Sequence, residues 1–352
     1  MLWVDKYKPT SLDHMDYHPD LSLHLKNMIK SSDFPHLLVY GPSGAGKKTR
    51  IMAILKEVYG PNCLKLKIDH RTFKHPSTNK NLQVTTISSP YHIEINAGEA
   101  GSNDRLIVQS IIKEIAQSPP IDSSVFGAFK IVILNEVDKL SKDAQHALRR
   151  TMEKYAASCR LILCCDSTSR VIDPIRSRCL GIRVPAPSIA DVQNVLNIVA
   201  TKEKFELPKK ISEEIAVKAK GNLRYALLML EAKKAKQYPF VEGVPLLDWE
   251  NYIQVIARDI IMEQTPAKLM AVRAKLYELI GHCIPPELII KTLTLELLDS
   301  IDNSLKCETI HWAAFYEHRI QIGTKPIFHL EAFIAKFMSC YKKFNSEPFV
   351  AQ

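Results

Sequence analysis

The stretch that decides the fold is Gly41-Pro42-Ser43-Gly44-Ala45-Gly46-Lys47-Lys48-Thr49. An apolar run at 37–40 precedes it, and a helical pattern begins near Arg50. A strand, a glycine-rich turn and a helix start are what a phosphate-binding loop requires, because backbone N–H groups and the helix N-terminus then surround the phosphates. Lys47 is expected to reach the β- and γ-phosphates as a point charge. An ordinary glycine-rich turn is the alternative interpretation.

The end of this motif departs from the signature G-x-x-x-x-G-K-[ST]. Lys48 stands where a hydroxyl group normally contacts magnesium, and Thr49 follows one position late. A second signal comes after the apolar run 131–134, where P-loop ATPases carry an Asp-Glu pair that supports the metal and polarises the attacking water. This chain has Asn135 and Glu136 there.

These two departures act in the same direction. Lys48 adds a cation where a metal should lie, and Asn135 removes a negative charge that attracts divalent cations. They predict a site that holds nucleotide phosphates and hydrolyses them poorly. No metal ligand is assigned with certainty; the alternative is that Thr49 or water replaces the missing ligand and the site stays active.

The composition is that of a basic, soluble chain with more than one domain. The chain has 352 residues, which exceeds one typical domain, and its net charge of +9 favours an anionic partner. No apolar run approaches the roughly 18 residues of a membrane span, and the N-terminus does not resemble a secretory signal. The eight cysteines show no C-x-x-C pair and no zinc-ligand spacing. Free thiols in a reducing compartment, the cytosol or the nucleus, are therefore expected.

Strand and helix patterns alternate from residue 36 to about 180, which predicts an α/β fold with a parallel sheet. Helices are expected at 20–30 and at 142–155, the second with Ser141 as its N-cap. Turn residues predict a loop at 119–127. The expected strands cover 36–40, 64–69, 83–88, 91–95, 129–134 and 160–165.

The two ends of the chain have other patterns. The N-terminal arm 3–9 is expected to be extended, because Pro9 restricts the residue before it. Pro185-Ala186-Pro187-Ser188 ends the alternating pattern, and only short helices are expected from 188 to 236. A second linker, 238–248, is followed by further helices. Two of them carry apolar stripes, formed by Leu269, Val272, Leu276 and Leu279 and by Leu330, Phe333, Phe337 and Tyr341.

Five segments together resemble the small subunits of the eukaryotic sliding-clamp loader, replication factor C. The resemblance covers essentially the whole chain and the order of its motifs. It is carried by the arm 3–9, the loop 41–49, the run Asp-Ala-Gln-His-Ala-Leu-Arg-Arg-Thr-Met-Glu-Lys-Tyr at 143–155, Ser177-Arg178-Cys179 and Gly221-Asn222-Leu223-Arg224.

The resemblance implies an AAA+ fold in three parts. These are a nucleotide-binding P-loop core with a parallel sheet (1–184), a helical lid (185–240) and an all-α C-terminal collar domain (241–352). It also implies a nuclear, DNA-dependent ATPase complex of one large and four small subunits that opens the sliding clamp and places it on primer–template DNA in replication and repair. ATP or ADP is the implied ligand, with magnesium in question, and no membrane is involved. The apolar stripes at 269–279 and 330–341 would hold the subunit to its partners.

The resemblance assigns functional residues one by one. Glu136 would be the catalytic glutamate, and Arg178 an arginine finger that reaches a neighbouring subunit's γ-phosphate in trans. Asp166 stands where the family usually has a polar Asn sensor, a third departure that points away from hydrolysis. The implied nucleotide contacts come from the loop residues Gly41 to Thr49 and from Val4, Tyr7, Lys8, Pro9, Asn135, Asp166 and Arg224.

A basic helix face completes the expected sites. The family places DNA near the helix at 142–155, and Arg149, Arg150 and Lys154 are candidates for sequence-independent contacts to the phosphate backbone. Arg149 could instead pair with Glu153 four residues on. Arg150 and Lys154 repel each other at the same spacing, which favours a face that meets phosphate.

Three functional hypotheses follow. In the favoured one the chain is a largely non-hydrolysing clamp-loader subunit that binds nucleotide and lends Arg178 to its neighbour. The first alternative is a self-sufficient P-loop ATPase subunit. The second is a structural subunit whose loop is vestigial.

Overall fold

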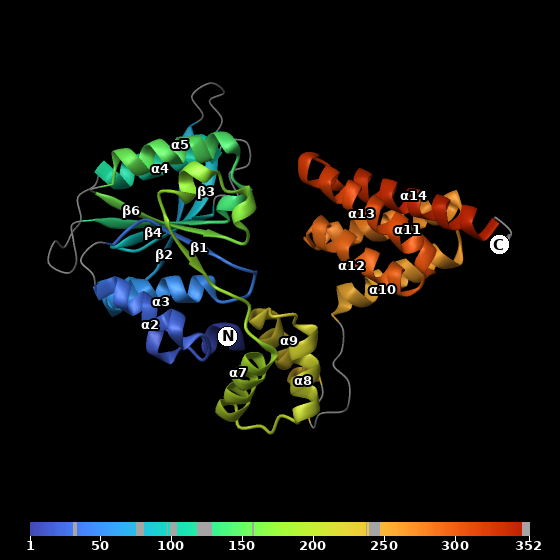
Figure 1. Ribbon diagram of the computed structural model, residues 1–352, viewed down its shortest axis with the longest axis horizontal. Helices are drawn as coiled ribbons and strands as arrows, with labels where there is room; N and C mark the ends of the chain where they lie inside the picture. Colours follow the sequence, from blue (N-terminus) through green and yellow to red (C-terminus); the bar gives the residue numbers. More distant parts are fainter. Residues whose placement is uncertain are drawn as a thin grey trace. The chain divides into compact units, whose positions relative to one another are not determined.

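The computed structural model describes residues 1–30, 34–74, 81–96, 98, 104–117, 129–156, 158–236, 238 and 247–346. The chain divides into two units, Met1–Val244 and Pro245–Gln352, here called the sheet unit and the helical unit (Figure 1). Each unit has apolar cores of its own. Among the described residues, no helix is long and apolar enough to cross a membrane.

Within the described residues, the strands of the sheet unit form a seven-stranded sheet in the order β2-β3-β4-β5-β6-β1-β7. The five strands from β4 to β7 in this order are parallel, whereas β2 and β3 are antiparallel to their neighbours. The α/β fold with a mostly parallel sheet is confirmed. The strand bounds are β1 (Leu37–Tyr40), β2 (Lys67–Lys74), β3 (Asn81–Ser88), β4 (His92–Asn96), β5 (Lys130–Asn135), β6 (Cys159–Cys165) and β7 (Leu180–Arg183).

Helices cover both faces of this sheet, α2 and α3 on one and α4 and α5 on the other (Figure 1). The central strands β5 and β6 are therefore buried on both faces, as their nearly continuous apolar runs predict. Ser141 caps α5 as expected, since its hydroxyl accepts a hydrogen bond from the Ala144 N–H. The helices on the sheet are α2 (Pro19–Lys30), α3 (Lys47–Tyr59), α4 (Asp104–Gln117), α5 (Lys142–Lys154) and the short α6 (Asp173–Arg176).

One expectation about this unit was wrong, and one strand was missed. The arm is not extended throughout, because α1 (Trp3–Lys6) forms one helical turn in which the Lys6 N–H donates to the Leu2 carbonyl at 2.9 Å. Pro9 restricts only the residue before it, so the preceding residues remain free to close this turn. Strand β7 was not expected, since Ile182 is its only buried residue and leaves no apolar pattern. The predicted loop 119–127 lies outside the described residues.

Three helices after the sheet form a small apolar core with the N-terminal segment. They are α7 (Ile189–Lys202), α8 (Lys209–Lys218) and α9 (Leu223–Lys236), in agreement with the short helices expected there. Trp3 and Tyr17 are buried in this core, and the Trp3 ring stacks on Phe205 with centroids 5.7 Å apart. The arm is thereby fixed beside the helices rather than on the sheet.

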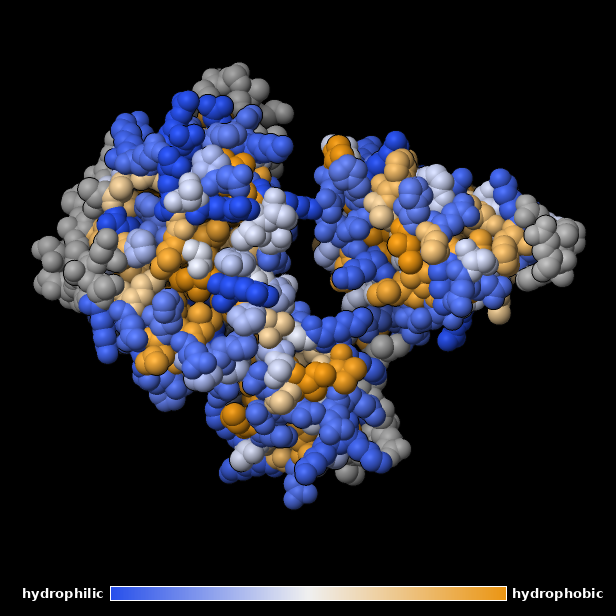
Figure 2. All heavy atoms as spheres, viewed as in Figure 1, coloured by the Kyte–Doolittle hydropathy of each residue, from blue (hydrophilic) through white to orange (hydrophobic). Residues whose placement is uncertain are grey.

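The helical unit consists of α10 (Asp248–Met262), α11 (Pro266–Gly281), α12 (Pro286–Asp299), α13 (Asn303–Ile322) and α14 (Pro326–Ser346). Both predicted stripes lie on helices, α11 and α14, and Thr265 caps α11. Their role as partner contacts was wrong, because Val272, Leu276, Leu330 and Phe333 are at most 1% exposed inside the unit's own core. Figure 2 shows apolar side chains on the surface of this unit. Its exposed apolar residues include Met262, Ile310, Ile322 and Phe328.

Candidate nucleotide-binding site

A cavity of about 400 Å³ lies in the sheet unit where the glycine-rich loop meets the arm, the strand ends of the sheet, α7 and α9. It brings together most of the residues that the sequence assigned to nucleotide, while Gly41, Pro42 and Ala45 are not in its wall. The assigned residues that line it are Val4, Tyr7, Lys8, Pro9, Ser43, Gly44, Gly46, Lys47, Lys48, Thr49, Asn135, Glu136, Asp166 and Arg224.

The loop is held in shape by groups packed against its glycines. Gly44 and Gly46 have φ values of 76° and 83°, a left-handed conformation that side chains rarely adopt. A Cβ at Gly46 would lie 2.2 Å from the Tyr17 hydroxyl, which donates to the Ala45 carbonyl at 2.9 Å. A Cβ at Gly44 would lie 1.8 Å from the side-chain oxygen of Asn222, just before α9. Only glycine fits at either position.

Lys47 points back into the loop. Its ammonium donates to the carbonyls of Gly41 at 2.7 Å and Pro42 at 3.0 Å, and to the Asp166 carboxylate at 2.5 Å. Asp166 follows β6, so the loop lysine is joined to the neighbouring strand. The carboxylate therefore neutralises Lys47 in this structure.

Lys48 is bound to a residue that the sequence did not single out, Glu94 on β4. The Glu94 carboxylate is 3% exposed, and one of its oxygens, Oε1, accepts from both the Lys48 ammonium and the Asn135 amide, the latter at 2.6 Å. A charged residue inside the apolar run Ile93-Glu94-Ile95 is the signal that could have identified it, because buried acids are rare without a partner. His92, two residues earlier, is 1% exposed, and burial lowers its pKa to about 4.

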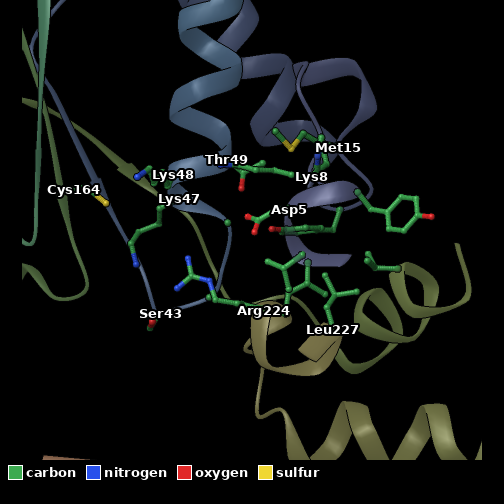
Figure 3. A pocket seen from close by; sticks show the side chains of 18 of the residues that line it. Asp5, Lys8, Met15, Ser43, Lys47, Lys48, Thr49, Cys164, Arg224 and Leu227 are labelled. Atoms are coloured by element: carbon green, nitrogen blue, oxygen red, sulfur yellow. The ribbon is translucent and has the colours of Figure 1, made fainter. Parts of the chain in front are cut away.

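Positive charges converge on the wall of the cavity. Burial lowers the pKa of Lys8 and the nearby charge of Lys48 lowers it further, whereas Glu94 and Asp5 raise it and Arg224 adds only a smaller lowering. Arg224 is exposed at the start of α9 and has no carboxylate partner among the described residues. Figure 3 shows its guanidinium directed toward the loop. An anion bound beside Lys8, Lys48 and Arg224 would be stabilised by these neighbouring positive charges.

The end of β5 carries the predicted catalytic glutamate. Glu136 has a φ of 54°, a strained conformation for a residue with a side chain, and such strain is concentrated at functional sites. Its carboxylate pairs with Lys139 at 3.1 Å, and both side chains are about half exposed. Glu136 lines the cavity, but in this structure it is already paired with a neighbouring cation.

The opposite end of the cavity is apolar and was largely missed from sequence. Tyr7 belongs to the same core as α7 and α9, and its hydroxyl donates to Glu203 at 2.6 Å. Lys6 also binds Glu203 at 2.7 Å, and these contacts lower the pKa of that carboxyl group. The apolar wall could be found only through the fold, since it comes from separate helices: Val195, Ile198, Val199, Leu223 and Leu227.

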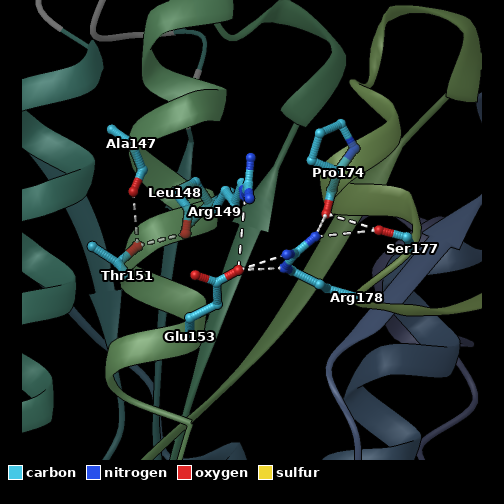
Figure 4. A network of polar contacts seen from close by, with 8 residues as sticks. All are labelled: Ala147, Leu148, Arg149, Thr151, Glu153, Pro174, Ser177 and Arg178. Atoms are coloured by element: carbon cyan, nitrogen blue, oxygen red, sulfur yellow. Dashed lines mark hydrogen bonds and ion pairs between the residues drawn. The ribbon is translucent and has the colours of Figure 1, made fainter.

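Arg178 lies outside this cavity. Its guanidinium binds Glu153 on α5, with Nε and Nη2 at 2.7 and 2.6 Å from the same oxygen, and donates through Nη1 to the Pro174 carbonyl at 2.8 Å (Figure 4). The side chain is 32% exposed. Arg178 therefore does not serve the chain's own loop.

The three basic residues of α5 differ from one another. Arg149 pairs with Glu153 at 3.7 Å, as the i,i+4 spacing allows, so Glu153 joins it to Arg178 (Figure 4). Arg150 is exposed and has no carboxylate partner among the described residues. Lys154 is exposed and lies over the Tyr155 ring at 5.4 Å. Of the three, Arg150 and Lys154 are thus the ones without a carboxylate partner among the described residues.

A parallel sheet with a glycine-rich loop at its strand ends, followed by a helical lid, defines a P-loop protein of the AAA+ type. Three family models match the chain: the C-terminal domain of replication factor C subunit 3 at 249–345, the RCF1/5-like AAA+ ATPase lid domain at 194–235, and the DNA polymerase III delta subunit at 17–188. The solved structure of a RuvB point mutant from Thermotoga maritima, 15% identical, covers 77% of this chain and 85% of its own with a TM-score of 0.50, which shows the fold alone.

Full-length relatives are much more similar. Probable replication factor C subunit 3 of Dictyostelium discoideum is 73% identical over 98% of this chain and 100% of its own length. Replication factor C subunit 3 of Homo sapiens is 55% identical over 98% of both chains. The chain belongs to the replication factor C small-subunit family and is most like subunit 3. The loop pair Lys47-Lys48 and the runs at 283–286 and 329–333 are the sequence features that point to that subunit.

Proposed function

We propose that this chain is a subunit of a nuclear clamp loader that uses ATP to open the sliding clamp and load it onto primer–template DNA in replication and repair. It assembles with one large and three other small subunits. It binds ATP or ADP in the cavity, hydrolyses it poorly, and gives Arg178 to a neighbouring site. The core, lid and collar correspond to 1–184, 185–240 and 241–352.

One observation carries the nucleotide assignment. A single cavity has the glycine-rich loop and converging cations at one end and an apolar wall at the other. Nucleotides have the same division into an anionic phosphate chain and a flat base. A vestigial loop would not need a lysine 9% exposed within it, nor glycines in a strained conformation.

Poor hydrolysis is supported by the groups around the γ-phosphate position. Asn135 donates its amide NH₂ to Glu94, and the Glu136 carboxylate is paired with Lys139, so Glu136 must leave this pair before it can orient an attacking water. Asp166 brings a carboxylate to the loop lysine. Each contact removes a group that hydrolysis requires from its catalytic position.

Equilibrium binding of a fluorescent ADP to the full chain tests the nucleotide assignment. Lys47→Ala is expected to weaken binding by about tenfold or more, whereas Lys113→Ala, an exposed lysine on α4, should leave it unchanged. Turnover of ATP by the isolated chain should be at the background level. Measurable turnover would support the self-sufficient ATPase, and absence of binding would support the vestigial loop.

The assembled complex tests Arg178. Because an arginine supplied in trans stabilises charge in the transition state, Arg178→Ala should lower the DNA-stimulated ATPase rate at least about tenfold with little change in nucleotide affinity. Arg176→Ala is the matched control, since Arg176 lies two residues earlier and pairs with Asp173 at 2.9 Å. An unchanged rate in Arg178→Ala would refute the assignment in trans.

The face of α5 is proposed to contact the DNA backbone through Arg150 and Lys154. Arg149 would contribute either after leaving its ion pair with Glu153 or while still paired with it. Charge removal at Arg150 should weaken binding of primer–template DNA by the complex equally for all sequences and reduce its dependence on salt. The same change at Arg105, an exposed arginine on α4, is the control.

A further inference from the structure

The family's magnesium ion does not fit the residues around this loop. Magnesium requires oxygen ligands in near-octahedral geometry, supplied by carboxylates, hydroxyls and water. At the position of the expected hydroxyl this chain has the Lys48 ammonium, which is a donor only. Among the described residues, no group of three His, Cys, Asp or Glu side chains could hold a metal ion.

Thr49 does not supply the missing ligand. Successive residues of a helix point about 100° apart, and Figure 3 shows Lys48 directed toward the strand that carries Cys164 and Thr49 toward the N-terminal segment. The hydroxyl is therefore displaced from the side of α3 that faces β4 to β6. Lys48, not Thr49, occupies the position next to Asn135 and Glu94.

The network around Lys48 holds its charge in place. Glu94 lies behind the cavity wall, almost fully buried, and does not itself line the cavity. Lys48 does line it, and its side chain is 44% exposed. The amide of Asn135, which replaces the usual metal-supporting acid, donates to the oxygen that also accepts from Lys48. The side chains of Glu94 on β4 and Asn135 on β5 thus hold the Lys48 ammonium in place beside the loop.

We propose that Lys48, positioned by Glu94 and Asn135, is a built-in counterion that replaces the divalent metal, so that this subunit binds its nucleotide without magnesium. An ammonium carries half the charge of the metal, and its three N–H groups are donors for phosphate oxygens. The inference rests on the proposed nucleotide binding at the same loop. It adds that Glu94 is a positioning residue, which acts on the nucleotide only through Lys48.

The test compares equilibrium binding of fluorescent ADP to the purified full chain in excess magnesium and in EDTA. The dissociation constants in the two conditions should agree within about threefold for the unmodified chain. Lys48→Thr restores the hydroxyl of the usual motif, and its affinity in EDTA should fall at least about tenfold. Lys113→Thr, the same change on the exposed face of α4, should behave as the unmodified chain.

A second variant shows whether a loss of ADP affinity comes from the missing charge or from a folding defect. Lys48→Met/Glu94→Gln removes both charges with little change in size, so no buried charge is left unpaired. Circular dichroism should show a folded chain, and its affinity in EDTA should also be reduced at least about tenfold.

Two different results would overturn the inference. If the unmodified chain binds ADP well in magnesium but at least about tenfold more weakly in EDTA, the proposed nucleotide binding stands and the built-in counterion is wrong. If Lys48→Thr keeps full affinity in EDTA, Lys48 is not the counterion. Absence of binding in both conditions would instead refute the nucleotide site itself, and the inference with it.

Discussion

The sheet unit and the helical unit bury different kinds of side chain. In the described part of the helical unit the buried polar residues are Thr294 and Thr309, whose hydroxyls donate to a carbonyl of their own helix at 2.6 and 2.9 Å. The sheet unit buries charged or titratable groups as well, among them Lys47, His92 and Glu94. Lys47 is in the loop, and His92 and Glu94 are on β4, from which Glu94 binds the loop residue Lys48.

This difference separates packing from ligand binding. An apolar core is stabilised by burial alone, while a buried charge lowers stability unless it is paired. The helical unit therefore has the composition expected of a unit that folds and assembles without holding a charged ligand. The charges near the loop reduce what the sheet unit gains from burial, and they are the groups that the proposed nucleotide would contact.

The largest expected effect tests the helical unit. Phe333→Ala removes a ring that is fully buried in α14, and it should lower the free energy of unfolding by about 3–5 kcal/mol. Urea unfolding monitored by circular dichroism measures the change. Phe328→Ala on the same helix, where the side chain is 53% exposed, should change it by about 0.5 kcal/mol or less. A weaker affinity of Phe333→Ala for nucleotide would show that the two units are not independent.

A buried charge in the sheet unit should have a somewhat smaller effect. Arg50 is 1% exposed and donates to the Tyr17 carbonyl at 2.7 Å and to the Ser22 hydroxyl at 2.9 Å. Arg50→Met leaves both acceptors unpaired, which should cost about 2–4 kcal/mol of unfolding free energy. Because Tyr17 also binds the loop, nucleotide affinity should fall too.

Arg105→Met is the control for this change, since Arg105 lies exposed on α4. If Arg50→Met is as stable as the unmodified chain, the buried guanidinium makes no net contribution to the free energy of unfolding. In that case the contrast between the units would concern composition and not energy.

The smallest effect concerns pH. The pKa of His92 is about 4 in the folded chain because burial disfavours its charged form, and it is 6.5 in the unfolded chain. As pH falls below 6.5 the unfolded state binds the proton first, so stability is complete above this pH and is lost progressively down to about pH 4. The loss from this group at pH 5, relative to pH 7.5, should be about 2 kcal/mol.

Urea unfolding at both pH values, for the unmodified chain and for His92→Leu, isolates this contribution. Other groups also titrate in this range, since burial and Arg160 lower the pKa of His36, but they are common to both proteins. Equal losses of stability in the two proteins would show that His92 does not titrate as the fold implies.

Much of the sheet unit could be predicted because its signals are local. Strands β5 and β6 are continuous apolar runs, the loop is a contiguous motif, and Ser141 stands directly before its helix. Strand β7 could not be found, because only one of its residues is buried. The partner role of the apolar stripes was wrong for a related reason: a stripe has the same pattern whether it meets another helix of the same unit or a different subunit.

The site divides in the same way. Lys47, Lys48, Asn135 and Asp166 lie in or directly after recognisable motifs, and the structure brings them together at one cavity. Glu94 was missed because β4 becomes the neighbour of β5 only through the sheet order. The pairing of Arg178 with Glu153, across 25 residues of sequence, is likewise a product of the fold.

The contact between α9 and the loop has a thermodynamic consequence. The Leu223 N–H donates to the Gly44 carbonyl at 3.3 Å, and Asn222 packs against Gly44 at the point where α9 begins. A nucleotide that shifts the loop backbone must therefore also bias the orientation of α7 to α9. By reciprocity, a partner that fixes these helices changes the affinity for nucleotide by the same factor as nucleotide changes the affinity for that partner. Ligand retention and the geometry offered to a neighbouring subunit are then two readouts of one equilibrium.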